Sequence, residues 1–165
     1  MTHAESRTYS FETRLPDPKQ MMSMSGLDYL RGILAGDFPA APISATLNFG
    51  PTELDQGRAV FEGTPERYTY NPLGTVHGGW AATILDSAMG CAVHTTLPVG
   101  VGYTTLELKL NYVRAVPADA GELRAEGTVI HAGGTVATAE GRLTAASDGR
   151  LLAHATTTCL IMRPR

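Results

Sequence analysis

The spacing of hydrophobic and polar positions changes along the chain, and each change marks an expected element. Residues 1–18 are mostly polar with no sustained apolar period, which predicts a flexible N-terminal arm. Apolar residues then recur near helical spacing, which predicts one amphipathic helix over about 19–35 within an N-terminal unit of residues 19–40. Three runs follow that alternate or carry β-branched and aromatic residues and predict short strands: AAPISATLNFG, GRAVFEGTP and RYTY.

The longest apolar segment, GGWAATILDSAMGCAVHTTL, predicts a helix that is hydrophobic nearly all round and is therefore buried. Four β-rich runs come after it: YTTLELKLNYVRAV, GELRAEGTVIH, TVATAEGRLTAA and LLAHATTTCLIM. The turn-forming separators AGG and SDGR indicate that the last three runs form an antiparallel meander. Residues 41–165 therefore predict an α+β domain in which a curved antiparallel sheet wraps around a long central helix.

Composition narrows the classes of protein that fit. The 165 residues are 43% hydrophobic and 18% charged, which supplies enough apolar material for one folded domain. A formal net charge of -3 gives no basic field for nucleic acid. Since there is no run of about 18 apolar residues and the N-terminus is polar, we expect a cytoplasmic protein with neither a membrane nor a nucleic-acid partner. Cys91 and Cys159 lie far apart in the sequence and are expected to be reduced and buried.

Standard motifs of metal sites, nucleotide sites and serine hydrolases are missing from the sequence. It contains no Walker loop, no GxGxxG, no HExxH and no GxSxG. The histidines lack the close spacing of metal ligands, so no metal site is expected; they are His3, His77, His94, His131 and His154.

Asp86 lies in the middle of the long apolar segment, where burial of an unpaired carboxylate is costly. At about 100° per residue it shares a stripe of small and polar residues with Gly79, Thr83 and Gly90. The stripe leaves room for a ligand beside the carboxylate. The alternative is that Asp86 caps a neighbouring backbone or pairs with an arginine.

The same helix is expected to begin at the sequence His77-Gly78-Gly79, with Asn71 six residues before the histidine. Glycines at a helix N-terminus allow a ligand to approach the free backbone N–H groups, and the positive end of the helix dipole suits a developing oxyanion. Alone, the two glycines are also typical of a tight turn before a helix. Together with the spaced acid and the asparagine, they favour a site that polarises a carbonyl group.

These motifs resemble a known family. The pattern N-x(5)-HGG, an acid nine residues after the histidine, the continuation DSAMGCA and the later run TTLELKLNYVRAV are similar to the PaaI-like (phenylacetic-acid-degradation-type) branch of hotdog-fold acyl-CoA thioesterases. The resemblance covers about residues 45–162, and SGLDYLRGILAGDFPAAPI resembles the N-terminal helix often found in that branch. It implies the hotdog fold, which agrees with the sheet and helix expected from the pattern.

The resemblance implies a role for each matching residue. Asp86 is expected to be the general base or the nucleophile toward the thioester, and the Gly78 N–H the donor to the thioester oxygen. His77 would support that turn, Asn71 would position water or the thioester, and Thr105 would hold the water. The expected substrate-binding residues are Gly79, Trp80, Thr83 and Thr104, although Trp80 and Met89 are more typical of a core or an interface than of a pocket.

The position of the strand hydroxyl is open at this stage. Strict alternation places Thr104, and not Thr105, on the face of Leu106 and Leu108. A β-bulge in this strand would bring Thr105 to that face instead.

The activity implied is hydrolysis of a small or medium acyl-CoA, including an aromatic one, with no cofactor because coenzyme A is part of the substrate. The rival hypotheses are an acyl-CoA-binding protein without turnover and a structural dimerisation domain. Retention of both Asp86 and Asn71 favours the enzyme, because binding alone does not need a carboxylate beside the thioester. Four basic residues are candidates for the nucleotide end of coenzyme A: Lys109, Arg114, Arg142 and Arg150.

The expected assembly follows from helix geometry. Gly78 and Asp86 are eight residues apart, so they stand about 12 Å apart along one helix, too far to act on one thioester. Two antiparallel helices across a two-fold axis would bring Gly78 of one chain beside Asp86 of the other. We therefore expect a homodimer with shared sites, and the resemblance implies that such dimers pair into a homotetramer.

Overall fold

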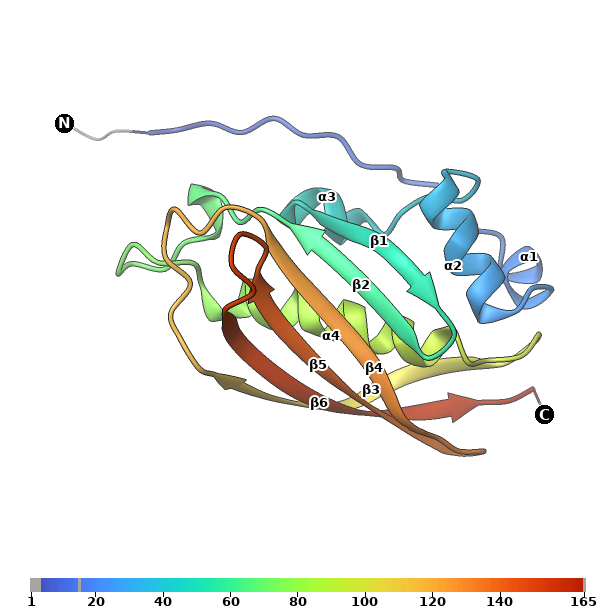
Figure 1. Ribbon diagram of the computed structural model, residues 1–165. Coiled ribbons are helices and arrows are strands. Elements are labelled where there is room, and N and C mark those ends of the chain that lie inside the picture. The colour runs from blue at the N-terminus through green and yellow to red at the C-terminus, as the bar shows by residue number, and fades with distance from the viewer. Residues whose placement is uncertain (1–3, 15, 165) are drawn as a thin grey trace.

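The structure is a computed structural model that describes residues 4–14 and 16–164. One antiparallel sheet has the strand order β1-β2-β4-β5-β6-β3 and curves around a central helix, α4, which spans Gly78–His94 (Figure 1). The strands are β1 (Phe49–Asp55), β2 (Arg58–Gly63), β3 (Gly102–Tyr112), β4 (Leu123–Ala132), β5 (Val136–Ala145) and β6 (Leu151–Met162). This is the hotdog fold, and the predicted α+β architecture is confirmed.

Helix α4 packs on the concave face of the sheet because apolar side chains cover most of its circumference. Ile84, Leu85 and Met89 are fully buried against strands β2, β4 and β5. Burying side chains of this size stabilises the fold by about 1.5–3 kcal/mol each. The predicted meander is also present, since β4, β5 and β6 pair in sequence order.

The N-terminal segment differs from the single helix expected over 19–35. It forms two helices, α1 (Pro18–Met22) and α2 (Gly26–Ala35). The break occurs at Ser25, whose backbone is extended and whose Oγ accepts a hydrogen bond from the Asp28 N–H at 3.2 Å, so that a new helix begins there. The apolar period continues across this cap, which is why the pattern suggested one helix.

Two of the expected short strands are helical instead. In the run AAPISATLNFG, residues Pro42–Leu47 form helix α3, and β1 begins only at Phe49. Proline suits the first position of a helix, and Asn48, with a φ of 57°, ends it in the left-handed conformation. The run RYTY contains a single 3-10 turn, η1 (Arg67–Thr69).

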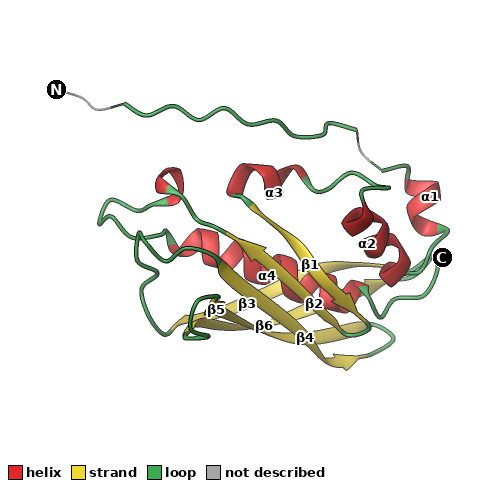
Figure 2. Ribbon diagram, turned by 45° about the horizontal axis from the view of Figure 1, so that its top comes forward, coloured by secondary structure: helices red, strands yellow, loops and turns green. Residues whose placement is uncertain are grey.

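The two edges of the sheet have different surroundings. Helices α2 and α3 lie beside β1 (Figure 2), and Arg31 of α2 donates a hydrogen bond to the Leu54 carbonyl at 3.3 Å. At the other edge, β3 pairs with β6 on one side, and no strand of the described residues pairs with its other side.

The N-terminal segment lies in an extended conformation near α3. Arg7 donates hydrogen bonds to the carbonyls of Ala45 and Thr46, and its guanidinium stacks over the rings of Tyr9 and Tyr68. The predicted flexibility of residues 1–18 stays a prediction, and residues 1–3 and 15 lie outside the described part of the chain.

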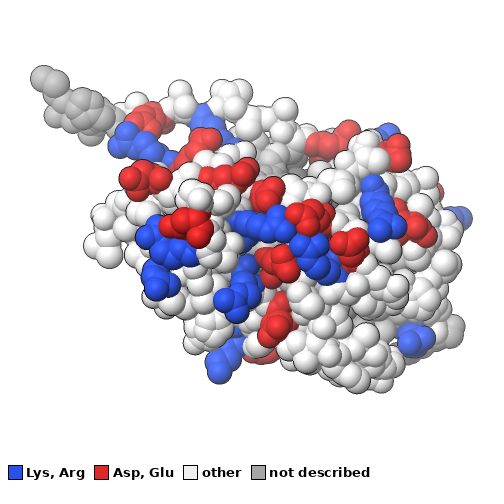
Figure 3. All heavy atoms as spheres, in the orientation of Figure 1, with Lys and Arg blue, Asp and Glu red and all other residues white. Residues whose placement is uncertain are grey.

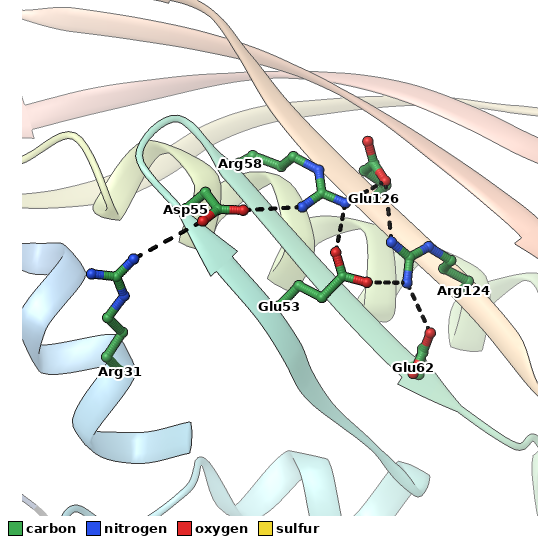
Figure 4. Close-up of polar contacts among 7 residues, drawn as sticks. All are labelled: Arg31, Glu53, Asp55, Arg58, Glu62, Arg124 and Glu126. Atoms are coloured by element: carbon green, nitrogen blue, oxygen red, sulfur yellow. Dashed lines mark hydrogen bonds and ion pairs between the residues drawn. The ribbon is translucent and has the colours of Figure 1, made fainter. Parts of the chain in front are cut away.

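Charged side chains of both signs alternate over the outer face of β1, β2 and β4 (Figure 3). Seven charged side chains form one network (Figure 4). Glu53 contacts Arg58 at 2.8 Å and Arg124 at 2.7 Å. Both arginines also contact Glu126, and the network continues through Glu62, Asp55 and Arg31. Hydrogen bonds from Arg124 and then Arg58 lower the pKa of Glu53 to about 2. The charged side chains of this network are therefore paired with one another within the chain.

None of the helices in the described part of the chain has the length and hydrophobicity that crossing a membrane requires.

Candidate active site

Helix α4 and strand β3 lie side by side with opposite chain directions, and three contacts between them fix their relative position. The Tyr112 hydroxyl donates a hydrogen bond to the Gly78 carbonyl at 2.9 Å, where α4 begins. The Thr105 hydroxyl donates one to Asp86 Oδ1 at 3.2 Å in the middle of the helix. The Tyr103 ring packs on Gly90, where a Cβ would lie 2.8 Å from the phenol oxygen. The expected catalytic residues thus lie along one line of contact.

A β-bulge decides which threonine faces Asp86. The register of β3 against β6 shifts between Thr105 and Glu107, so Leu106 is the extra residue. As a result Thr105 is partly buried against Asp86, whereas Thr104 is exposed on the opposite face of the strand. The structure therefore brings Thr105 to the carboxylate and leaves Thr104 away from it.

Asp86 is partly buried, and Thr105 is its hydrogen-bond partner. No lysine, arginine or histidine of the described residues lies within ion-pair distance of it, so the alternative role as an arginine partner is not observed. Its negative charge adds to burial in raising the pKa of the Cys91 thiol to about 12. Cys91 is therefore protonated at neutral pH and is no thiolate nucleophile.

The turn at the start of α4 exposes a backbone donor. The His77 ring caps the helix, because its Nδ1 accepts a hydrogen bond from the Gly79 N–H at 2.8 Å. Across residues 4–14 and 16–164, no protein group accepts from the Gly78 N–H. A side chain at Gly78 would collide with Tyr112, whose hydroxyl oxygen would lie 2.6 Å from a Cβ. Gly78 thus combines a free donor with a close contact to Tyr112, whose ring would have to shift to admit a side chain there.

Asn71 shapes the loop that leads to this turn. Its Oδ1 accepts hydrogen bonds from the N–H groups of Leu73 and Thr75, and its Nδ2 donates to the Thr75 hydroxyl at 2.8 Å. Asn71, His77 and Gly78 line one pocket of about 430 Å³. These three predicted residues are therefore brought together, with one Nδ2 hydrogen of Asn71 left for a ligand.

The remaining expected residues have structural roles within the chain. Trp80 is 2% exposed, and its Nε1 donates to the Leu47 carbonyl at 2.7 Å, so it belongs to the core. The Thr83 hydroxyl donates to the carbonyl of Gly79 one turn earlier. Gly79 itself is exposed at the helix start.

Within one chain the two groups of site residues stay apart. Gly78 and Asp86 are both in α4, eight residues and about 12 Å apart. The pocket at the helix start and the carboxylate at its middle therefore form two half-sites.

One residue near the helix start, Tyr112, was not singled out from the sequence. Its hydroxyl donates to the Gly78 carbonyl, a contact that depends on how β3 packs against the start of α4 and that has no local signal in the sequence. Arg114 lines the same pocket as Gly78 and donates to the Leu151 carbonyl at 2.8 Å. Of the other basic candidates, Lys109 and Arg142 alternate with inward-facing residues and lie on the outer face, and Arg150 lies 3.8 Å from Asp148. The structure thus places Arg114 nearest to the expected site.

In the part of the chain that the structure describes, no three histidine, cysteine or acidic side chains converge as metal ligands do. His3 lies outside the described residues.

Comparison with known proteins adds sequence and structural relatives. Residues 73–152 match the profile of the Thioesterase superfamily. A Halobacterium salinarum protein, provisionally assigned as an esterase, is 45% identical over 69 residues, which are 41% of this chain. The match spans 44% of the length of that curated relative.

Several solved structures share the whole domain. A phenylacetic acid degradation-related protein from Ralstonia eutropha, provisionally assigned as a thioesterase, is 30% identical with a TM-score of 0.72, over 80% of this chain and 98% of that one. A thioesterase family protein from Silicibacter pomeroyi is 26% identical with a TM-score of 0.72, over 82% and 96%. The PaaI protein of E. coli, at 18% identity, shares the fold with a TM-score of 0.71 over 85% and 96%.

Proposed function

The chain belongs to the thioesterase superfamily, and from this membership we propose that it hydrolyses acyl-CoA thioesters to a free acid and coenzyme A. The observation that carries the proposal is Asp86, a carboxylate on an otherwise apolar helix that is held by Thr105 and has no cationic partner in the described residues. A carboxylate in such a place is a candidate general base. The acyl group is small or medium in size, including aromatic acyl groups.

In the proposed reaction Asp86 accepts a proton from a water molecule as the water oxygen bonds to the thioester carbonyl carbon. The negative charge that develops on the carbonyl oxygen is stabilised by the Gly78 N–H of the partner subunit and by the positive end of α4. The C–S bond then breaks, and the proton held by Asp86 passes to the departing CoA sulfur. The products are a carboxylic acid and a thiol, with no cofactor consumed.

The proposed site is shared between two chains, because one α4 cannot bring Gly78 and Asp86 to the same thioester. Support comes from β3, an 11-residue edge strand whose outer backbone groups are unpaired among the described residues. Pairing of two β3 strands about a two-fold axis would set the adjacent α4 helices antiparallel. Further pairing of such dimers into a homotetramer is part of the same proposal.

The test is free-thiol release from a panel of acyl-CoAs by the wild type and by Asp86→Asn. This substitution keeps the shape of the side chain and removes its negative charge, so kcat should fall by at least about 10², within the usual range for loss of a general base. Asp119→Asn, the same change on an exposed loop, is the matched control. Near-normal turnover by Asp86→Asn would rule out the assigned role.

The rival hypothesis is an acyl-CoA-binding protein without turnover. It predicts binding of acyl-CoA by calorimetry and no thiol release above the rate in buffer, for the wild type as well as the variant.

A further inference from the structure

A second pocket lies at the opposite end of α4 from Gly78. It has a volume of about 470 Å³ and is bounded by the α1 segment, the last turn of α4, the start of β3 and the end of β6. Its walls are mostly apolar and include four methionines, Met21, Met22, Met24 and Met162. A volume of this size is typical of small-molecule sites, which span about 300–1,000 Å³.

The pocket lies on the same line of contact as Asp86. Tyr103, which forms one wall, precedes Thr105 by two residues in β3, a distance of about 7 Å along a strand. On the helix side, His94 also lines the pocket and follows Asp86 by eight residues, or about 12 Å. The walls of the cavity therefore begin about 7 Å along β3 from Thr105, the partner of Asp86, and reach His94, about 12 Å along α4 from Asp86.

The chemistry of the walls favours a flexible apolar occupant. Methionine side chains have three rotatable bonds and adapt to irregular shapes. Burial lowers the pKa of His94, so its ring is neutral near pH 7. The cation on the rim, Arg163, already donates from its Nε to the Gly134 carbonyl at 3.2 Å. A charged ligand would thus find little to pair with, whereas hydrocarbon would be buried on several sides.

We propose that this methionine pocket binds the distal end of a straight-chain acyl group of medium length, such as octanoyl. The inference rests on the proposed function, because it assumes that the thioester carbonyl lies beside Asp86. An acetyl or a benzoyl group held there would end before the pocket begins, whereas the last carbons of an octanoyl chain reach it. The pocket thus selects for acyl length, and straight chains are preferred over short or aromatic acyl groups.

The test uses binding of S-alkyl thioethers of coenzyme A, which cannot be hydrolysed, measured by calorimetry. Each methylene buried in the pocket should tighten binding about fourfold, so S-octyl-CoA should bind the wild type at least tenfold more tightly than S-ethyl-CoA. Met21→Trp fills the pocket with an indole and should reduce this octyl-to-ethyl ratio at least tenfold. Met162→Trp acts from the other wall on a side chain that is 45% exposed and so tolerates substitution.

Leu34→Trp is the matched control, because Leu34 is exposed on α2 and does not line the pocket. It should keep the wild-type ratio. An octyl-to-ethyl ratio near one in the wild type, or an unchanged ratio in both methionine variants, would overturn the proposal.

Hydrolysis assays separate this inference from the proposed function. If the wild type releases thiol but the methionine variants keep its preference for octanoyl-CoA over butanoyl-CoA, the pocket assignment fails and the thioesterase assignment stands. If no acyl-CoA is hydrolysed while the thioether ratio behaves as expected, the thioesterase assignment fails and the pocket remains an acyl-binding site.

Discussion

Thr105 reaches Asp86 because Leu106, the next residue along β3, is an extra residue in the ladder with β6. Without the bulge, the alternation of the strand would set Thr104 on the helix side, together with Leu108 and Leu110. The bulge thus aims one hydroxyl at the carboxylate, and it keeps the apolar residues beyond it packed against α4.

The hydrogen bond between Thr105 and Asp86 should matter for turnover. Thr105→Val keeps the shape of the side chain and removes the donor, and a hydrogen bond to a charged group contributes about 1.5–3 kcal/mol. We expect kcat for acyl-CoA hydrolysis to fall about tenfold or more. Thr104→Val, the same change on the exposed face, should leave kcat within about twofold of the wild type, since exposed substitutions usually cost under 0.5 kcal/mol. Equal losses in the two variants would contradict the bulge-based assignment.

Tyr112→Phe tests whether the Tyr112 hydroxyl holds the start of α4 in place. The substitution removes the hydrogen bond to the Gly78 carbonyl and should lower the free energy of unfolding by about 1 kcal/mol. Because Gly78 loses its fixed position, kcat should fall more than KM changes. Tyr9→Phe, on the exposed N-terminal segment, is the control for loss of a phenol. A kcat equal to that of the wild type would show that the turn holds its geometry without this contact.

Complementation tests the shared site. Asp86→Ala and Asn71→Ala should each be inactive, and after they are unfolded and refolded together the mixed dimers should carry one intact site. Random pairing makes about half of the dimers mixed, so about a quarter of the wild-type activity should return. Heterodimers demonstrated by mass, with no recovered activity, would refute a site built from both chains.

The charge network should make the free energy of unfolding depend on pH in the acidic range. The pKa of Glu53 is lowered in the folded state to about 2, from an ordinary value near 4.5, so the network's contribution is full above pH 4.5 and is lost as the pH falls toward 2. Urea unfolding from pH 6 to pH 2 should therefore show a steeper decline in the free energy of unfolding for the wild type than for Glu53→Gln. Parallel curves for the two proteins would contradict the coupling. Glu140→Gln, at an exposed position of β5 outside the network, is the matched control.

The sequence alone predicted the elements whose period is long and regular. Seventeen residues of α4 and the long strands β3 to β6 repeat their pattern often enough to be recognised. Short elements were harder: Pro42–Leu47 contains the β-branched residues Ile43 and Thr46, yet it is a helix that a proline begins and Asn48 ends. The cap at Ser25 interrupts a pattern that hydrophobic spacing alone cannot divide.

The sequence also predicted only part of the candidate site, namely the residues that have a local signal. Asp86 and Gly78 follow from a carboxylate in an apolar helix and glycines at its start, which are local signals. The role of Tyr112 depends on contact between β3 and the start of α4, so it required the folded structure. The methionine pocket is assembled from four separate segments and has no signature in any of them.

The unequal edges of the sheet limit how far association can proceed. Edge β1 is flanked by α2 and α3, and Arg31 already occupies the Leu54 carbonyl, whereas β3 offers the uncovered edge in the described part of the chain. When two copies join through β3, each contributes its open edge to the other, and both outer margins of the doubled sheet are β1 strands beside helices. Strand-by-strand growth would then stop at two, and β1 also carries Pro51 and the charged residues Glu53 and Asp55, which disfavour open-ended, fibre-like polymerisation at that edge.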